Sequence, residues 1–217
     1  MVEFAALRDF VKICGITSVD DAHMVVDEGA DALGLIFAPT SPRRVDVVLA
    51  GTIADVIGER VLRVGVFRDN LEIHIRDVVE AVDLDVIQLH DAPSRELHDW
   101  LIADGMIVIR ALSIADQTLA RFEERYFDAV LVDGPAPGSG ETHSWSQVSG
   151  RTWQRPFIAA GGLRPSNVTS VIEATGAWGV DVASGVEIAP GVKGRSLVHD
   201  FVQLARSAFD QRKGTRV

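Results

Sequence analysis

Short runs of apolar and β-branched residues alternate along the chain with longer amphipathic stretches. Each short run is nearly continuous in apolar residues, which is typical of a strand buried on both faces of a parallel sheet. Eight such runs are present. The predicted strands are Val11–Ile16, Ala32–Phe37, Leu62–Phe67, Val86–His90, Ile107–Ala111, Ala129–Asp133, Phe157–Gly161 and Val180–Ser184.

The stretches between these runs carry start and stop signals of helices. Ser18-Val19-Asp20-Asp21 is close to a capping box and opens a first helix, which Gly29 closes. The stretch Trp145–Trp153 has the fewest helix signals among the predicted helices. The other predicted helices lie near Val45–Gly58, Leu71–Val82, Ser94–Ala103, Asp116–Glu124, Pro165–Ala174 and Leu197–Gln211.

Eight strands in alternation with helices predict a parallel (β/α)8 barrel, the TIM barrel, as one domain over residues 1–217. The alternative is a doubly wound open sheet, but no dinucleotide-binding glycine fingerprint is present. The length suits one domain, and no linker divides the chain. In such barrels the chemistry lies at the carboxyl ends of the strands, so polar residues there are the candidates for a site.

Composition and charge narrow the class of partners. The chain is 47% hydrophobic, enough for a substantial core, and its net charge is −10. An acidic surface argues against a general nucleic-acid surface but leaves an anionic substrate open. One cysteine cannot form an internal disulfide, and no metal-type Cys/His spacing is present. Without a leader or a bilayer-length apolar run, we expect a reduced, soluble, cytoplasmic domain that binds neither metal nor membrane.

Two neighbouring strand ends are rich in glycine. The seventh predicted strand ends at Gly161-Gly162 before a helix that begins at Pro165, and the eighth ends at Ser184-Gly185. Glycine lets an anion approach backbone N–H groups, and the start of a helix adds its positive end. Tight turns alone would explain either glycine site. Together, on adjacent strands, they predict a phosphate site.

Two ionisable side chains close the first and sixth predicted strands. Cys14 is the only cysteine of the chain, and Asp133 ends the run Leu131-Val132-Asp133. A thiol and a carboxyl group that face one substrate can divide the work of base and acid. Cys14 must then lose its proton, and Asp133 must have a raised pKa. The alternatives are a small buried hydrophobe for Cys14 and a loop-capping carboxylate for Asp133.

Further candidates lie in the loops that follow the strands. Arg43 stands beside Pro42 in a loop that also contains Pro39, so its guanidinium could bind a carboxylate at two points. The alternative is a basic surface loop. His90 ends the fourth predicted strand, where it lines the site or packs as a hydrogen-bonded core histidine. The glycine- and proline-rich loop Gly134–Thr142 is either a cover for the substrate or a connector.

Taken in order, these segments resemble the phosphoribosylanthranilate isomerases, barrel enzymes of tryptophan biosynthesis. The matching tracts span nearly the whole chain, and the ordered set is specific although each tract is modest. The tracts are Lys12-Ile13-Cys14-Gly15-Ile16, Gly29–Gly34 with Phe37, Ser41-Pro42-Arg43, Val64–Phe67, Gln88-Leu89-His90, Leu131-Val132-Asp133, Gly138-Ser139-Gly140, Ala160–Leu163, Val180-Asp181-Val182, Ser184–Glu187 and Pro190–Lys193.

The resemblance implies an Amadori rearrangement of N-(5'-phosphoribosyl)anthranilate to 1-(2-carboxyphenylamino)-1-deoxyribulose 5-phosphate. By this resemblance Asp133 is the general acid that protonates the furanose ring oxygen, and ring opening gives an iminium ion. Cys14, as the thiolate, is the general base that removes the C2 proton. The resulting enolamine then tautomerises to the ketone. The resemblance implies no metal or organic cofactor, because the substrate nitrogen acts as the electron sink.

The same resemblance implies the binding residues. Arg43 would hold the anthranilate carboxylate, and the two glycine turns would bind the phosphate. Asp181 matches a family position near the substrate, and His90 is expected to bind the substrate as well. The expected partner is a small phosphorylated molecule, bound by a monomer or a homodimer.

The chain departs from the family pattern at four places. Asp91 stands where glycine is usual, and His143-Ser144 stands where Phe-Asp is usual. Ala183 replaces a serine, and Gly194 replaces an aspartate. None of these positions is the expected acid, base or arginine. The departures bear on loop closure and phosphate affinity more than on the type of reaction.

Two other functions remain open. Another phosphosugar barrel enzyme is one of them, but an epimerase needs metal-binding side chains at several strand ends. An indole-glycerol-phosphate synthase needs catalytic lysines, and only Lys12 lies in a predicted strand. The other is a non-catalytic barrel that binds a phosphorylated metabolite, which would need none of Cys14, Arg43 and Asp133.

Overall fold

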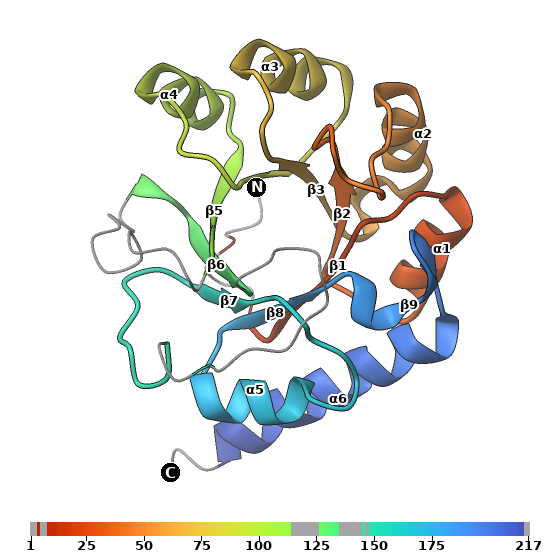
Figure 1. The fold of residues 1–217 in the computed structure, drawn as a ribbon, viewed down its shortest axis with the longest axis vertical. Coiled ribbons are helices and arrows are strands. Elements are labelled where there is room, and N and C mark those ends of the chain that lie inside the picture. The colour runs from red at the N-terminus through yellow and green to blue at the C-terminus, as the bar shows by residue number, and fades with distance from the viewer. Residues whose placement is uncertain (1–3, 5–7, 114–125, 135–144, 146–147, 215–217) are drawn as a thin grey trace.

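Eight parallel strands close into a barrel in the computed structural model of the chain, which describes residues 4, 8–113, 126–134, 145 and 148–214. Each strand pairs with the next in sequence, and β8 pairs with β1 (Figure 1). This confirms the predicted barrel over the open sheet. The strands are β1 (Phe10–Cys14), β2 (Ala32–Ile36), β3 (Leu62–Phe67), β4 (Val86–Leu89), β5 (Ile107–Ser113), β6 (Ala129–Asp133), β7 (Phe157–Ala159) and β8 (Gly179–Val182).

The described helices lie outside the barrel and pack against the outer faces of its strands (Figure 1). The predicted cap of the first helix is confirmed, since the Ser18 side chain accepts a hydrogen bond from the Asp21 N–H at 3.1 Å. Within the described ranges the α-helices are α1 (Val19–Asp27), α2 (Val47–Ile57), α3 (Glu72–Ala81), α4 (Arg95–Ala103), α5 (Val168–Thr175) and α6 (Arg195–Gly214).

The connection between β6 and β7 differs from the prediction. The helix expected over Trp145–Trp153 is wrong for the residues described there, which form a turn in which Val148 donates to the Trp145 carbonyl at 3.1 Å. Gly150 has a φ of +75°, a left-handed conformation that ends helical geometry. The predicted helix at Asp116–Glu124, and all but the first residue of the Gly134–Thr142 loop, lie outside the described residues.

A hairpin that the sequence patterns did not predict follows β8. The 3-10 turn η6 (Ser184–Val186) leads into β9 (Glu187–Ala189), which pairs antiparallel with β10 (Val192–Lys193). Gly191 between the two strands has a φ of +79°, as a tight reversal requires. The hairpin returns the chain toward β1 before α6 begins, because the Thr17 hydroxyl donates to the Gly191 carbonyl.

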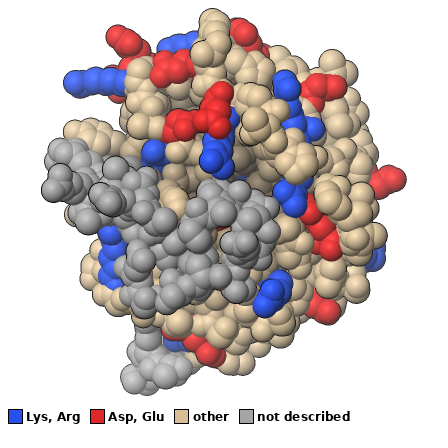
Figure 2. Space-filling model, in the orientation of Figure 1, with Lys and Arg blue, Asp and Glu red and all other residues tan. Residues whose placement is uncertain are grey.

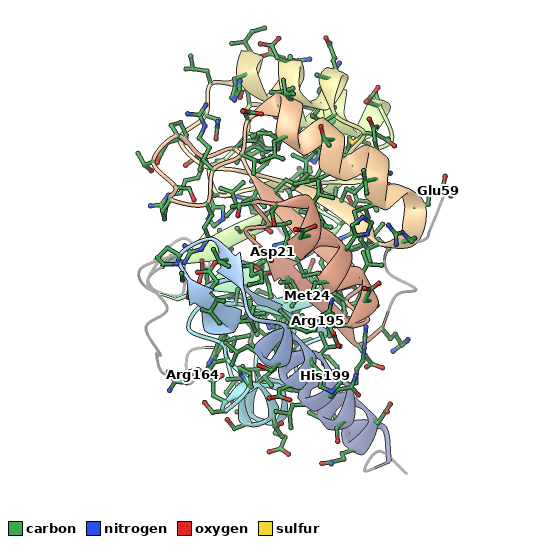
Figure 3. The ribbon with its side chains drawn as sticks, turned by 90° about the vertical axis from the view of Figure 1, so that its right-hand side faces the viewer. Asp21, Met24, Glu59, Arg164, Arg195 and His199 are labelled. Carbon is green, nitrogen blue, oxygen red and sulfur yellow. The ribbon has the colours of Figure 1, made fainter. Side chains whose placement is uncertain are left out.

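The last helix, α6, packs against both α5 and α1 on the outside of the barrel. In Figure 3, Arg195 and His199 lie on α6 beside α1. Both side chains contact Glu28, at the end of α1, with an Arg195 Nη1–Oε1 distance of 2.6 Å and a His199 Nδ1–Oε2 distance of 2.8 Å. None of the described helices has the length and apolar character needed to cross a membrane.

The inside of the barrel changes from apolar to polar along its axis. At the amino end of the strands, the Phe4, Phe10 and Trp178 rings pack against one another at centroid distances of 5.2 to 5.4 Å and fill the bottom of the barrel. Side chains alternate between inside and outside along each strand, so Phe10, Lys12 and Cys14 of β1 all point inward. The polar members of this series therefore lie in the middle and at the mouth.

Three aspartates that precede strands connect neighbouring strands at the amino end of the barrel. The side chain of each accepts a hydrogen bond from a backbone N–H group near the start of the preceding strand, so side chains add to the hydrogen bonds of the sheet there. The donor–acceptor pairs are Val11 N–H to Asp31 at 2.7 Å, Arg63 N–H to Asp85 at 2.8 Å and Val108 N–H to Asp128 at 2.8 Å.

Candidate active site

A cavity of about 240 Å³ opens at the carboxyl ends of the strands. The structure brings together eight of the nine residues predicted for the site, which come from strands and loops far apart in sequence. Gly185 is the one that does not line the cavity. The eight residues are Cys14, Arg43, His90, Asp133, Gly161, Gly162, Asp181 and Ser184.

Cys14 shares its face of β1 with a buried lysine. Lys12 is fully buried, and its Nζ donates to Asp181 Oδ1 at 2.9 Å. Asp181 is the register partner of Lys12 on β8. Burial raises the pKa of the Cys14 thiol above its ordinary value, and the charge and hydrogen bond of Lys12 oppose this rise. Burial likewise works to lower the pKa of Lys12, but Asp181 and Cys14 outweigh it and leave that pKa raised.

Gly34 makes room for the thiol. It is the register partner of Cys14 on the neighbouring strand β2. A Cβ atom at position 34 would lie 2.7 Å from Cys14 Sγ and 3.2 Å from Lys12 Nζ. Any larger residue would therefore displace the sulfur or the ammonium group.

Asp133 lies at the end of β6 with only 9% of its surface exposed. Its Oδ1 accepts the Gly134 N–H at 2.7 Å, so the carboxyl group caps the loop and also lines the cavity. Burial raises the pKa of Asp133 to about 6, against the lowering effect of that hydrogen bond. A Cβ at Gly161 would lie 2.5 Å from Asp133 Oδ1, so this glycine is required for the packing of the acid.

Arg43 is held by a carboxylate of its own chain. Its Nε and Nη2 donate to Oε1 and Oε2 of Glu187 at 2.7 and 2.8 Å. The side chain is 8% exposed and crosses over Gly15, where a Cβ would lie 2.6 Å from Arg43 Cδ. The basic surface loop considered for Arg43 is therefore wrong. In the described part of the chain Nη1 has no hydrogen-bond partner, and it is the nitrogen left for a ligand.

Lys193 of the hairpin connects three strand ends. Its Nζ donates to the Cys14 carbonyl at 2.7 Å, the Ala183 carbonyl at 3.1 Å and Glu187 Oε1 at 2.9 Å. Burial lowers the pKa of Lys193, while Glu187 opposes this. Since Glu187 also holds Arg43, the hairpin positions the arginine and the end of β1 together.

His90 is a neutral member of the site. Its Nε2 lies 3.2 Å from the Nε2 of Gln88, two residues earlier on the same face. Burial, together with the positive charges of Arg68 and Lys12, lowers the pKa of His90 to about 4. At neutral pH the ring is therefore uncharged, and it lines the cavity as a hydrogen-bonding group. The Oε1 atom of Gln88 is buried and has no partner among the residues described.

The two glycine turns differ in what they do. Gly161 and Gly162 have φ values of +85° and +65°, and we find no acceptor in the described chain for their N–H groups or for that of Ser184. These N–H groups can therefore bind an anion. Gly185 has a packing role instead, because a Cβ there would lie 1.8 Å from the Leu163 carbonyl oxygen. It lets the loops after β7 and β8 touch.

The departures from the family pattern lie around the rim. Asp91 accepts a hydrogen bond at 2.6 Å from the backbone of the loop after β3. Ala183 lines the cavity without a hydroxyl group. A Cβ at Gly194 would lie 2.7 Å from the Ile188 side chain, so glycine allows the hairpin to pack closely. His143-Ser144 lie outside the described residues.

Metal-binding side chains do not gather in the part of the chain that is described. No group of three His, Cys, Asp or Glu residues there could hold a metal ion. Over the described surface that Figure 2 shows, Lys and Arg are interspersed with Asp and Glu. The polar groups of the cavity are thus side chains and backbone N–H groups of the barrel itself.

A closed parallel barrel with ionisable groups around one cavity at its carboxyl end defines a (β/α)8-barrel enzyme. The sequence profile of the N-(5'phosphoribosyl)anthranilate (PRA) isomerase family matches residues 11–204. The chain belongs to this family, and it is an isomerase. The resemblance drawn from the sequence is thereby confirmed.

Relatives match over nearly their full length. The N-(5'-phosphoribosyl)anthranilate isomerase of Cellvibrio japonicus is 40% identical over 205 residues, which are 93% of this chain and 95% of the relative. The crystal structure of the Thermotoga maritima enzyme is 35% identical, has a TM-score of 0.82, and is covered to 98% by 91% of this chain. A structure of the isomerase in complex with reduced 1-(o-carboxyphenylamino)-1-deoxyribulose 5-phosphate is 33% identical, with a TM-score of 0.76 and coverage of 91% and 98%.

Sequence reasoning missed several residues of the site. Lys12 and Gln88 each interrupt an apolar run that was predicted as a strand, and a charged or amide group in such a run was a usable signal. Glu187 and Lys193 belong to strands of three and two residues, which are too short to show a pattern. Gly34 lies in a tract that matches the family, but its role beside the thiol depends on its register partner Cys14.

Proposed function

We propose that this isomerase catalyses the Amadori rearrangement of N-(5'-phosphoribosyl)anthranilate in tryptophan biosynthesis, with Cys14 as general base and Asp133 as general acid. The product is 1-(2-carboxyphenylamino)-1-deoxyribulose 5-phosphate. The observation that carries the proposal is that the thiol and the carboxyl group enter one cavity from β1 and β6. Membership of the family supports the choice of reaction.

Asp133 acts in the first step. Its proton passes to the furanose ring oxygen, the bond from that oxygen to C1 breaks, and the nitrogen lone pair forms an iminium ion. A pKa of about 6 leaves roughly a tenth of Asp133 protonated at pH 7. Burial in the loop cap therefore keeps a carboxylic acid available near neutral pH, which an exposed aspartate could not do.

Cys14 acts in the second step. The thiolate takes the C2 proton, and the electrons of that C–H bond move to the iminium nitrogen and give a neutral enolamine. Tautomerisation of the enolamine yields the ketone, so the atoms balance without a redox partner. The cationic iminium would lie against the sulfur and favour its thiolate form, as an opposite charge does at short range.

Three groups would hold the substrate at its charged ends and hydroxyl groups. Arg43 would bind the anthranilate carboxylate through Nη1, since Glu187 already occupies its two-point face. The N–H groups of Gly161, Gly162 and Ser184 would bind the phosphate. Asp181 and His90, which line the cavity, would bind the sugar hydroxyls.

The wider setting follows the same family. We propose that residues 1–217 work as one domain, in the cytoplasm, as a monomer or homodimer, without a cofactor and without nucleic-acid or membrane partners. One related structure is described as monomers generated from the dimeric Thermotoga maritima isomerase. Light scattering after gel filtration measures the oligomeric state, and a mass above that of a dimer would contradict the proposal.

The decisive experiment follows the fluorescence decay of freshly made phosphoribosylanthranilate. The wild type should consume it rapidly, whereas Cys14→Ala and Asp133→Asn should each lower kcat by about a hundred- to ten-thousand-fold. Circular dichroism checks that both variants are folded. A folded wild type without turnover, or a variant with full turnover, would contradict the proposed chemistry.

A further inference from the structure

Four residues of β1, β2 and β8 meet at one point inside the barrel. Lys12 and Cys14 are two positions apart on β1 and point to the same side. Lys12 is paired in register with Asp181, and Cys14 with Gly34. The position of a missing Cβ at Gly34 lies 2.7 Å from Cys14 Sγ and 3.2 Å from Lys12 Nζ. The thiol and the ammonium group therefore share the space above this glycine.

Lys12 is an unusual residue to find in this place. It is fully buried, and Asp181, which accepts a hydrogen bond from its Nζ at 2.9 Å, is 7% exposed. Taking both charges out of water is costly, and a hydrophobic pair of similar size would often be at least as stable. A buried ion pair next to a titratable thiol is therefore better explained by its effect on the thiol than by its contribution to folding.

We propose that Lys12 is a positioning residue that stabilises the thiolate form of Cys14, with Asp181 fixing the ammonium group and Gly34 leaving the space in which nitrogen and sulfur meet. The inference deepens the proposed function and rests on Cys14 being the base. Lys12 itself does not exchange a proton with the substrate. Its positive charge compensates the negative charge that develops on sulfur in a site from which water is largely excluded.

Other charged groups face the same sulfur with smaller or opposite effects. Asp181 disfavours the thiolate because it is an anion, while Lys193 of β10 favours it. Arg43, from the loop after β2, also interacts with the charge of Cys14. Lys12 exerts the largest favourable effect among them. The proposal therefore predicts that removing Lys12 raises the pKa of Cys14 and that removing the charge of Asp181 lowers it.

The test measures the thiolate directly, without substrate. Cys14 is the only cysteine of the chain, so the rate of its alkylation by iodoacetamide as a function of pH, followed by mass spectrometry, reports one group. Lys12→Met should raise the pH midpoint by about one to three pH units, and Asp181→Asn should lower it. The double variant should lie between the two. Arg44→Met, which removes an exposed cation of the nearby loop, is the matched control and should leave the midpoint unchanged.

Lys12→Met leaves Asp181 buried without a partner and can fail to fold. The comparison of Asp181→Asn with the double variant then decides, because both lack the unpaired carboxylate. A double variant with a higher midpoint than Asp181→Asn supports the proposal. Equal midpoints in these two folded proteins, or a folded Lys12→Met with the wild-type midpoint, would overturn it.

Turnover separates this inference from the proposed function. In a folded Lys12→Met variant, kcat at neutral pH should fall at least tenfold, and the alkaline pH at which the rate begins to decline should move upward with the pKa of Cys14. A loss that is equal at all pH values, without a shift of the alkylation midpoint, indicates a structural role and contradicts the inference. Full turnover by Cys14→Ala would contradict the base assignment instead, whatever the alkylation series shows.

Discussion

Aspartates at the two ends of the barrel differ in how their oxygens are used. At the amino end, both oxygens of Asp31 are bound, one by the Val11 N–H and one by Arg206. Asp85 is likewise bound through both oxygens by Arg63. At the mouth, Asp181 has one described partner, Lys12 at Oδ1.

Asp133, like Asp181, has only one of its two carboxylate oxygens bound by a described residue. Its Oδ1 accepts the Gly134 N–H, while Oδ2 has no partner in the described residues. A carboxylate that is saturated by its own chain holds the structure together, whereas one that keeps an oxygen toward a cavity can serve a ligand. The same residue type therefore has a structural use at one end and a chemical use at the other.

The largest contrast should come from removing one aspartate at each end. Asp133→Asn should lower kcat by about a hundred- to ten-thousand-fold and leave the free energy of unfolding nearly unchanged or higher. Asp31→Ala should lower the free energy of unfolding by about 1–3 kcal/mol, because it leaves the Val11 N–H without its partner, and should leave kcat within about twofold. Urea denaturation and the fluorescence assay measure the two effects. A large loss of kcat in a folded Asp31→Ala variant would contradict the purely structural role of the aspartates at the amino end.

Buried cations should show the next contrast. Lys12→Met should lower the free energy of unfolding by about 3–5 kcal/mol because Asp181 is left charged and buried. Adding Asp181→Asn should restore most of this loss. Arg63→Met, at the amino end, should cost less, about 1–2 kcal/mol, because the side chains of its partners Asp85 and Asp83 are 29% and 74% exposed and remain solvated. Equal losses in urea denaturation for Lys12→Met and Arg63→Met would show that the mouth carries no special electrostatic strain.

The pH dependence of kcat/KM should locate the acid. Below about pH 6 Asp133 is protonated, so each pH unit gains about tenfold in thiolate and in rate. Above pH 6 the loss of the protonated acid cancels this gain, and the profile becomes flat until the raised pKa of Cys14 is passed, beyond which it falls. Arg68→Met removes a positive charge that lowers the pKa of Asp133, so the bend should move to higher pH. A profile that keeps rising through pH 8 would contradict the assignment of the acid.

Two glycines should differ in the sign of their effect on stability, and the second gives the smallest effect of all. Gly34→Ala places a methyl group against Cys14 and should cost about 1–3 kcal/mol, with a lower alkylation rate of the thiol. Gly51→Ala, in α2 where a Cβ meets nothing within 4 Å, should instead stabilise the protein by up to about 1 kcal/mol. Thermal unfolding measures both. A neutral Gly34→Ala variant would show that the space above Gly34 can adapt.

Strand order and the location of the mouth could be predicted because buried parallel strands read as continuous apolar runs. The same reasoning placed Cys14, Asp133 and the glycine turns at strand ends, where the structure gathers most of them. It failed at Trp145–Trp153, where a left-handed glycine outweighs weak helical periodicity. Local patterns are reliable where burial alone determines conformation.

Pairings between distant positions could not be predicted in the same way. Arg43 and Glu187 are 144 positions apart, and nothing local marks Glu187 as the partner. Lys12 and Asp181 are 169 positions apart, but they become neighbours as soon as closure of β8 onto β1 is assumed. Pairing of the polar residues inside the first and eighth strands, as closure of the barrel requires, predicts the Lys12–Asp181 contact. The hairpin strands β9 and β10 have only three and two residues, so no sequence pattern predicts their contacts.

The contacts that Lys193 of the β9–β10 hairpin makes with the first strand and helix have a consequence for the synthesis of the protein. Lys193 holds the carbonyl of Cys14, 179 positions away, and its N–H donates to Asp21 of α1. On the ribosome the first strand and helix emerge long before these partners exist. In a nascent chain that has not yet exposed Lys193, the Cys14 carbonyl lacks its hydrogen bond to Lys193, and Arg43 lacks its ion pair with Glu187. We therefore expect no turnover during synthesis, and we expect Cys14 to stay accessible to alkylating and oxidising reagents until translation is nearly finished.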